Sequence, residues 1–214
     1  MVKSQSKNWQ KSQKRNCMYN KYEYIDLDFI YTDQHTGVLK NIPQIMDAES
    51  LVFFESSAVA ARLQELATTP IHVEFANDLL KIHQHLFQDV YTWAGQPRRV
   101  EISKGGRQFL PMHAFPQAFA YIDQLLNEYS HIANRKTDIA QKLAQILDNV
   151  NFLHPFREGN GRTQREFIRT LALQRGYILD LNPIDNVNVY NRYMADTIAG
   201  NVDDLADLIC ELLQ

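Results

Sequence analysis

One short segment, residues 154–165 with the sequence HPFREGNGRTQR, contains several residues that can bind phosphate. Gly159 and Gly161 allow the backbone to approach a ligand closely. A helix that begins near Gly161 would offer the unpaired N–H groups of its first turn to an anion. Arg162 and Arg165 lie on one side of that turn, and two guanidinium groups beside backbone N–H groups suit a polyphosphate better than a single carboxylate. The segment therefore predicts a polyphosphate site.

Two further residues of this segment point to chemistry at the bound phosphates. A carboxylate such as that of Glu158 would repel them unless a divalent cation lies between, so we expect Glu158 to hold Mg²⁺. His154, at the other end of the loop, has an ordinary pKa of about 6.5 and can accept a proton from an attacking hydroxyl as a general base. We expect Phe156 to point inward and anchor the loop. Five other histidines are expected to be structural: His72, His83, His85, His113 and His131.

Helical periodicity surrounds the segment, and Pro and Gly are sparse, with 7 and 8 in the chain. Pro155 ends the preceding helix at about Leu153, and Gly176 ends the helix that follows. Asp47 is a candidate N-cap. Apolar residues at helical spacing predict seven helices, at 47–66, 73–87, 115–131, 138–153, 162–175, 189–200 and 203–213. The fourth and fifth of these flank the segment and must position its side chains.

One stretch departs from this helical pattern. In residues 99–109, Val100 and Ile102 alternate with polar residues, and Gly105-Gly106 follows as a turn. This pattern predicts a β-hairpin, and a lone hairpin is marginal as a core element, so we expect it to serve as a flap or an exposed edge. The predicted fold class is all-α, a helical bundle with one small β-hairpin.

The composition is that of a globular domain: of 214 residues, 45% are apolar, and 22 basic side chains stand against 25 acidic ones. It excludes a collagen-like, disulfide-scaffold or wholly disordered chain. Residues 1–22 hold six basic residues and no acidic one. This arm could bind nucleic acid, an anionic lipid surface or an acidic partner, or simply remain solvated, as charge runs usually do. The acidic remainder disfavours nucleic acid. No uncharged run of about 18 apolar residues occurs, so we expect no membrane span and a cytoplasmic location.

Residues 154–165 match the pattern H-P-F-x-D/E-G-N-G-R-x-x-R at every fixed position, and the chain thereby resembles the Fic (filamentation induced by cAMP) family. Residues 91–98 and 102–106 are similar to the segment before the family's flap and to the flap itself. The resemblance implies a Fic domain over residues 45–214, with the hairpin of residues 99–111 as a flap over the active site. It leaves residues 1–22 as a flexible arm and 23–44 as an extension that packs on the core.

The resemblance also implies an activity, the transfer of AMP from ATP to a Ser, Thr or Tyr hydroxyl of a target protein. The enzyme class is a nucleotidyltransferase (protein adenylyltransferase). Carried over by position, His154 is the base, Glu158 holds Mg²⁺ on the α- and β-phosphates, and Arg162 and Arg165 contact the β- and γ-phosphates. The full set implied at the nucleotide is Lys104, Gly105, Arg157, Glu158, Gly159, Asn160, Gly161, Arg162 and Arg165. The open edge of the flap would hold the target segment by strand addition.

The family's inhibitory motif, S/T-x-x-x-E-G/N, does not occur in this chain, because no glutamate has Ser or Thr four residues before it. The chain therefore resembles the Fic class that is inhibited by a separate small antitoxin, and we expect the glutamate of that partner to pair with Arg165. Related toxins modify type II DNA topoisomerases and host-directed relatives modify small GTPases. We favour a bacterial intracellular target, with translocation into a host cell as the alternative for an effector.

Two alternative functions remain. A Fic-fold enzyme could transfer UMP, phosphocholine or a phosphoryl group, although the kinase-type relatives depart from the G-N-G-R that this chain keeps. A non-catalytic nucleotide or nucleic-acid binder could use the basic arm. The pocket that selects the base is not readable from the pattern; Asn191, Met194 and Ile198 are candidates, and core packing is the competing explanation for each.

Overall fold

Two long neighbouring helices, α5 (Lys136–Leu153) and α6 (Asn160–Gln174), carry the predicted phosphate segment between them. The computed structural model describes residues 23–24, 26, 29–104, 107–183 and 186–214. The apolar stripe of α5 is completely buried, as expected for a central helix. Its fully buried members include Ile139, Leu143, Ile146, Leu147, Val150 and Leu153.

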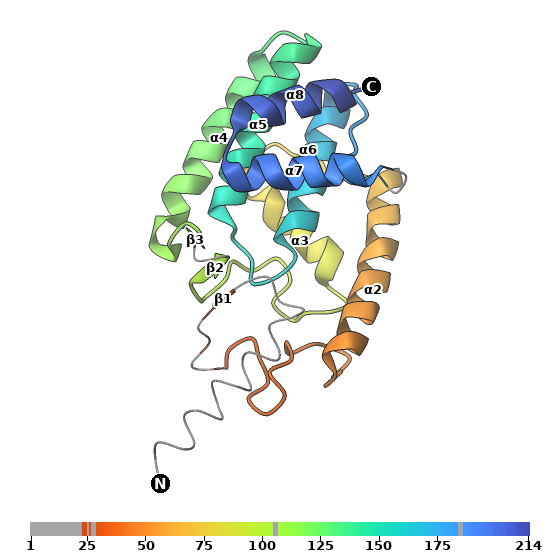
Figure 1. The fold of residues 1–214 in the computed structure, drawn as a ribbon, viewed down its shortest axis with the longest axis vertical. Coiled ribbons are helices and arrows are strands. Elements are labelled where there is room, and N and C mark those ends of the chain that lie inside the picture. The colour runs from red at the N-terminus through yellow and green to blue at the C-terminus, as the bar shows by residue number, and fades with distance from the viewer. Residues whose placement is uncertain (1–22, 25, 27–28, 105–106, 184–185) are drawn as a thin grey trace.

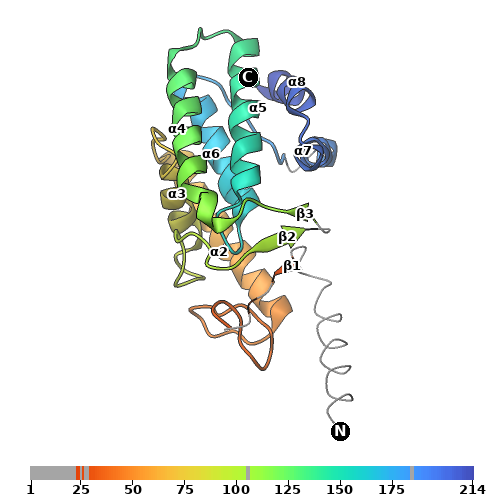
Figure 2. The same ribbon diagram turned by 90° about the vertical axis from the view of Figure 1, so that its left-hand side faces the viewer.

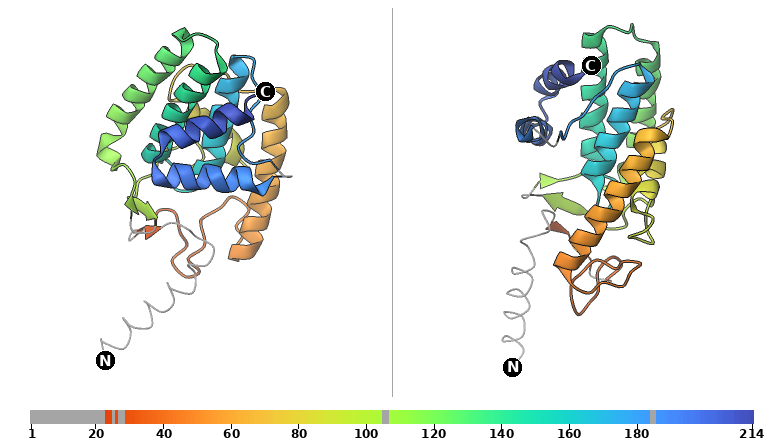
Figure 3. Two further views of the ribbon diagram at one scale, coloured as in Figure 1. Left: turned by 45° about the horizontal axis from the view of Figure 1, so that its top comes forward. Right: turned by 90° about the vertical axis from the view of Figure 1, so that its right-hand side faces the viewer.

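The remaining helices surround this pair. In Figure 3, α7 and α8 lie on one side of α5 and α6, and α2 and α3 lie on the other. Helix α4 runs beside α5, and α8 packs across it (Figure 1). The bounds are α2 (Ala48–Thr68), α3 (Asp78–Phe87), α4 (Phe115–His131), α7 (Val187–Ala199) and α8 (Val202–Leu212). The described part of the chain thus confirms the predicted all-α class, and none of its helices is long and apolar enough to cross a membrane.

Most helix ends agree with the predictions, because the signals at those ends are local. Helix α4 has the predicted bounds, Asp47 caps α2 by accepting the N–H of Ser50 at 2.7 Å, and Gly176 follows α6 at a φ of 81°. The prediction for α3 was wrong at its start by five residues. The carboxylate of Asp78 accepts the N–H groups of Glu74 and Phe75 at 2.8 and 2.9 Å, which commits these groups to a turn.

The predicted hairpin is present as β2 (Ile102–Lys104) and β3 (Arg107–Gln108), with Ser103 opposite Gln108. Its turn at Gly105-Gly106 lies outside the described residues. A short strand that the sequence pattern did not predict, β1 (Glu23–Tyr24), pairs antiparallel with the other edge of β2. The resulting order is β1-β2-β3, and the sheet lies at the lower end of α5 and α6, where these two helices are joined (Figure 2).

The residues between β1 and α2 contribute to the same core. Tyr31, Val38 and Leu39 are buried, and Thr32 forms an isolated bridge with Leu39. The carboxylate of Asp26 organises the entry to this stretch by accepting the N–H groups of residues 30, 31 and 32 at 2.7 to 3.1 Å. The basic arm predicted at residues 1–22 lies outside the described residues.

Candidate active site

The loop between α5 and α6 begins with a strained residue. His154 adopts left-handed backbone angles, φ 42° and ψ 61°, an unusual conformation for a residue with a side chain. The buried Arg98 holds the backbone there: its Nε donates to the His154 carbonyl at 3.0 Å, and its own N–H donates to the Pro155 carbonyl at 2.6 Å. These two hydrogen bonds from Arg98 therefore help to hold the predicted catalytic residue in its strained conformation.

The imidazole of His154 is held in one tautomer. Its Nδ1 lies 3.0 Å from the carbonyl oxygen of Asn151, and because a carbonyl can only accept, Nδ1 must carry the proton. In the neutral ring the basic nitrogen is therefore Nε2, the arrangement that a general base needs. Phe109 stacks on the ring with 3.8 Å between centroids and 18° between planes.

Phe156 and Asn160 close the loop on itself. Phe156 is completely buried, with its side chain in the core as expected for an anchor. The Asn160 side chain accepts the N–H of Phe156 at 2.9 Å and donates to its carbonyl at 2.8 Å. The Asn160 side chain is buried and committed to the loop, so its role in this structure is to hold the loop closed.

His83, which sequence reasoning placed only among the structural histidines, supports the loop from beneath. Its ring stacks on Phe156 with 3.7 Å between centroids. Nδ1 accepts the N–H of Gly95 at 2.8 Å, so Nε2 carries the proton and donates to the carbonyl of Glu158 at 3.0 Å. Burial lowers the pKa of His83 to about 3, which keeps the ring neutral. Nothing in the local pattern around His83 indicates this contact, because its partner lies 75 residues away.

The two glycines of the segment have different reasons to be glycine. Gly159 has a φ of 82°, and a Cβ there would lie 2.3 Å from Cζ of Phe87, so both the backbone angle and the core require it. A Cβ at Gly161 would instead lie 3.3 Å from Nη1 of Arg165. The explanation that both glycines serve the ligand therefore does not account for Gly159, whose missing side chain makes room for a ring.

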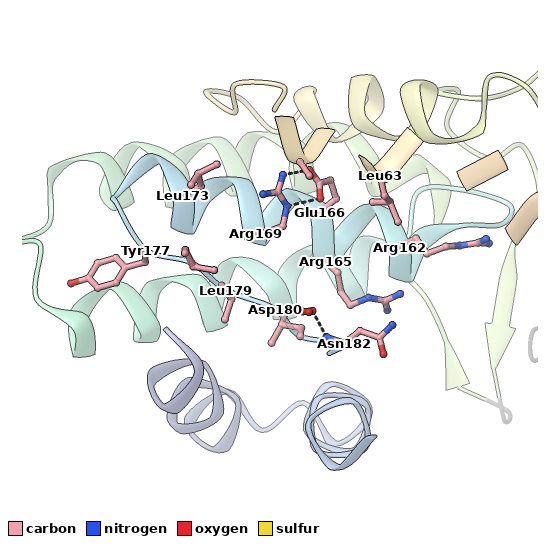
Figure 4. Close-up of a pocket in the computed structure, with 13 residues that line it drawn as sticks. Leu63, Arg162, Arg165, Glu166, Arg169, Leu173, Tyr177, Leu179, Asp180 and Asn182 are labelled. Atoms are coloured by element: carbon pink, nitrogen blue, oxygen red, sulfur yellow. Dashed lines mark hydrogen bonds and ion pairs between the residues drawn. The ribbon is translucent and has the colours of Figure 1, made fainter. Parts of the chain in front are cut away.

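The two arginines of the first turn of α6 line the same pocket (Figure 4) but contact different elements. Arg162 forms an ion pair with Glu55 of α2 at 2.5 Å, lies 3.6 Å from Glu158 and stacks over Phe87. Arg165 lies over the rings of Tyr190 and Tyr193 of α7, at 5.5 and 5.8 Å. In the described part of the chain, Arg165 has no carboxylate within ion-pair distance.

Three other residues that the resemblance places at the nucleotide are either buried or lie, wholly or in part, outside the described residues. Arg157, one of the three, is completely buried and offers no exposed surface to a ligand in this structure. The side chain of Lys104 and the whole of Gly105 lie outside the described residues. Among the candidates for base selection, Met194 packs partly against the core, whereas Asn191 and Ile198 are exposed.

Glu158 is the residue expected to hold Mg²⁺. Its partly exposed carboxylate accepts the N–H of Gly159 at 3.0 Å, and burial together with the charge of Glu55 raises its pKa. Among the described residues, no group of three His, Cys, Asp or Glu side chains is placed to hold a metal ion. A cation here would depend on one carboxylate, phosphate oxygens and water, which is a donor set that Mg²⁺ commonly takes.

A cavity of about 370 Å³ lies beside the arginines, between α2, α6 and residues 177–182 (Figure 4). Its walls are partly apolar, with Leu63, Leu173 and Leu179 among them. Arg162 and Arg165 line one end, and an ion pair between Arg169 and Glu166, at 2.7 Å, lines the wall.

The helical fold thus brings together a histidine with a basic Nε2, a helix N-terminus with two arginines and a partly exposed carboxylate. The chain belongs to the Fic/DOC family, whose model matches residues 73–172. The family prediction is thereby confirmed.

Named relatives and solved structures extend the match. The chain is 37% identical over 181 residues to the protein adenylyltransferase VbhT of Bartonella schoenbuchensis, an alignment that covers 84% of this chain and 38% of VbhT. It is 32% identical over 201 residues to the probable protein adenylyltransferase y4lH of Sinorhizobium fredii, covering 90% of this chain and 97% of y4lH. The crystal structure of BepC, a VirB-translocated effector protein of Bartonella tribocorum with bound AMPPNP, has a similar fold. Its TM-score is 0.74 at 21% identity, and the match covers 87% of this chain and 97% of that one.

Proposed function

We propose that this protein is a nucleotidyltransferase that transfers AMP from ATP to a hydroxyl group of a target protein. The observation that carries the proposal is the tautomer of His154, whose Nδ1–H is held by the Asn151 carbonyl, next to the helix N-terminus that bears Arg162 and Arg165. The names of VbhT and y4lH support the reaction, and the AMPPNP bound to BepC supports ATP as the co-substrate.

The proposed reaction begins when the target hydroxyl donates its proton to Nε2 of His154. The hydroxyl oxygen forms a bond to the α-phosphorus of ATP, and the bond from that phosphorus to the bridging oxygen of the β-phosphate breaks. Pyrophosphate leaves, AMP stays on the target as a phosphodiester, and the imidazolium returns its proton to water. Backbone N–H groups of the first turn of α6, with Arg162 on the β-phosphate and Arg165 on the γ-phosphate, would stabilise the negative charge.

Glu158 would hold Mg²⁺ at this site, where the ion would neutralise charge on the α- and β-phosphate oxygens. Gly159, Asn160 and Gly161 would contribute backbone N–H groups. We leave Arg157 out of the nucleotide-binding set because its side chain has no exposed surface.

We infer that the target segment adds to the outer edge of β3. In the described sheet, β1 already covers the other edge of β2, so β3 keeps a free edge. Phe109 follows β3 directly and stacks on His154, so a strand paired with β3 would run close to the base. A bacterial protein in the cytoplasm is the proposed target, with a type II DNA topoisomerase as the first candidate. The description of BepC as a translocated effector supports host delivery as the alternative.

We also propose a small antitoxin protein whose inhibitory helix carries the S/T-x-x-x-E-G/N motif. Arg165 lines one end of the cavity between α2 and α6 and has no carboxylate partner among the described residues, so a glutamate from a partner could pair with it. Expression of the chain alone should then be toxic. If expression of the chain is not toxic although no small protein co-purifies with it, the proposal of an antitoxin is contradicted.

The main test uses the His154→Ala variant in cell lysate. With α-³²P-ATP, the wild-type protein should label a target and His154→Ala should not, although both should bind ATP. The exposed His72→Ala serves as the control and should label like wild type. Labelling from γ-³²P-ATP would instead indicate phosphoryl transfer, and stronger labelling from α-³²P-UTP would indicate UMP transfer. Transfer that survives His154→Ala unchanged would refute the assignment of the base.

A further inference from the structure

Glu55, which lies outside every motif of the sequence, joins α2 to the phosphate site. Its buried carboxylate accepts a hydrogen bond from the hydroxyl of Tyr91 and lies 2.5 Å from Nη2 of Arg162. An ion pair that is largely withdrawn from solvent is costly to break from one side, because the remaining charge is left without compensation. Glu55 and Arg162 are therefore expected to act as a unit.

The surroundings of Arg162 define the orientation of its guanidinium group. Phe87 lies against one face, with 4.7 Å from Cζ to the ring centroid. Both carboxylates, Glu55 at 2.5 Å and Glu158 at 3.6 Å, approach the same nitrogen, Nη2. A guanidinium group carries five N–H donors, more than two contacts at one nitrogen use, so donors remain for a phosphate.

Tyr91 keeps Glu55 in place. Its ring is buried and stacks on Trp93, with 4.2 Å between centroids. Burial and the nearby charge of Glu55 raise the pKa of Tyr91, so the hydroxyl stays protonated and donates. A rigid aromatic residue thus fixes the carboxylate that contacts Arg162.

We propose that Glu55, held by Tyr91, is a positioning residue that directs the guanidinium of Arg162 toward the β-phosphate of the bound nucleotide. This inference rests on the proposed function, which places the β-phosphate at Arg162. Glu55 contacts no reacting atom and acts through Arg162. The alternative, in which Glu55 competes with phosphate for Arg162, predicts the opposite effect on affinity when the charge is removed.

The test compares two nucleotides that differ by the β-phosphate. Binding of ADP and of AMP, each with Mg²⁺, is measured by isothermal titration calorimetry in the His154→Ala background, which cannot turn over. Glu55→Gln keeps the size of the side chain and an acceptor for Tyr91 but removes the charge. It should weaken ADP binding about tenfold, as expected when a charge-assisted contact is lost, and leave AMP binding within about twofold. Tyr91→Phe should act in the same direction with a smaller effect.

Glu65→Gln is the matched control, because Glu65 lies on the same helix, is exposed and also forms an ion pair with an arginine, Arg62. It should leave both affinities unchanged. In an Arg162→Ala background, Glu55→Gln should have no further effect on ADP binding. If Glu55→Gln lowers the melting temperature of the protein, the Tyr91→Phe variant replaces it in the test. The loss of ADP affinity relative to AMP affinity is then compared in the same way.

Three outcomes would overturn the inference: ADP binding that is unchanged or tighter in Glu55→Gln, equal losses for ADP and AMP, or a full additional loss in the Arg162→Ala background. A separate result, obtained with Arg162→Ala, would refute the proposed contact between Arg162 and the β-phosphate. If Arg162→Ala leaves the ratio of the ADP and AMP affinities unchanged, Arg162 does not contact the β-phosphate.

Discussion

The ring of Phe109 lies nearly parallel to the imidazole of His154, with 3.8 Å between centroids and 18° between planes. Phe109 belongs to the hairpin, because its N–H donates to the Ile102 carbonyl at 3.2 Å. The next residue, Leu110, donates its N–H to the carbonyl of Phe152 at the end of α5. The hairpin is therefore attached to the helix that presents the base, and it covers one face of the imidazole.

Replacing Phe109 should impair turnover more than nucleotide binding. Phe109→Ala removes the surface that holds the imidazole plane, so we expect kcat to fall about tenfold with little change in KM for ATP. Phe109→Tyr keeps the stacking and should restore most of the activity. Initial rates of label transfer from α-³²P-ATP to lysate protein measure both effects. Wild-type rates in Phe109→Ala would mean that the stacking has no catalytic consequence.

Arg98 should be intolerant even of lysine. Its buried guanidinium donates to the carbonyls of His154, Val100 and Leu110 at 3.0, 2.7 and 2.6 Å. An ammonium group cannot reproduce this planar fork, so Arg98→Lys should lower the free energy of unfolding by about 3 kcal/mol. Urea denaturation measures the loss. Arg99→Lys, at the exposed neighbouring position, is the control and should cost nothing measurable; equal stabilities of the two variants would contradict the structural role of Arg98.

Gly159 and Gly176 separate backbone strain from steric conflict. Both have a positive φ, 82° and 81°, but a Cβ at Gly159 would lie 2.3 Å from Phe87, whereas nothing lies within 4 Å of a Cβ at Gly176. Gly176→Ala should lower the free energy of unfolding by about 1 kcal/mol from the backbone angle alone. Gly159→Ala should lower it by about 2 kcal/mol more, because the ring must move. Similar losses in the two variants, measured by chemical denaturation, would show that Phe87 gives way freely.

His83 should make stability depend on pH. Burial lowers its pKa to about 3 in the native protein, whereas the unfolded chain binds a proton below the ordinary value of about 6.5. Stability should therefore fall as the pH drops from about 6.5 toward 3, and the contribution between pH 7 and pH 5 is about 2 kcal/mol.

The His83→Gln variant should lose this contribution and show a shallower decline in the free energy of unfolding between pH 7 and pH 5. The exposed His72→Gln should decline like wild type. Identical slopes for wild type and His83→Gln would mean that His83 binds its proton equally in the native and unfolded states.

The helices were predictable where their signals are local. An apolar stripe marks α5, an aspartate caps α2, and a glycine ends α6, and each of these effects acts within a few residues. The start of α3 was not predictable, because Asp78 diverts neighbouring N–H groups into a turn that competes with the helix. Strand β1 is two residues long and pairs with a strand far along the chain, so no periodicity could indicate it.

The amino-acid sequence by itself determined the chemistry of the site. His154, Glu158, Arg162 and Arg165 lie within one segment of 12 residues, and the geometry of a loop that enters a helix fixes their approximate relation. Only the tertiary structure decided what supports them. Glu55 reaches Arg162 from α2, His83 holds the Glu158 carbonyl from α3, and Arg157 is withdrawn into the interior. These contacts depend on how separate helices pack against one another, and no local spacing in the chain encodes that packing.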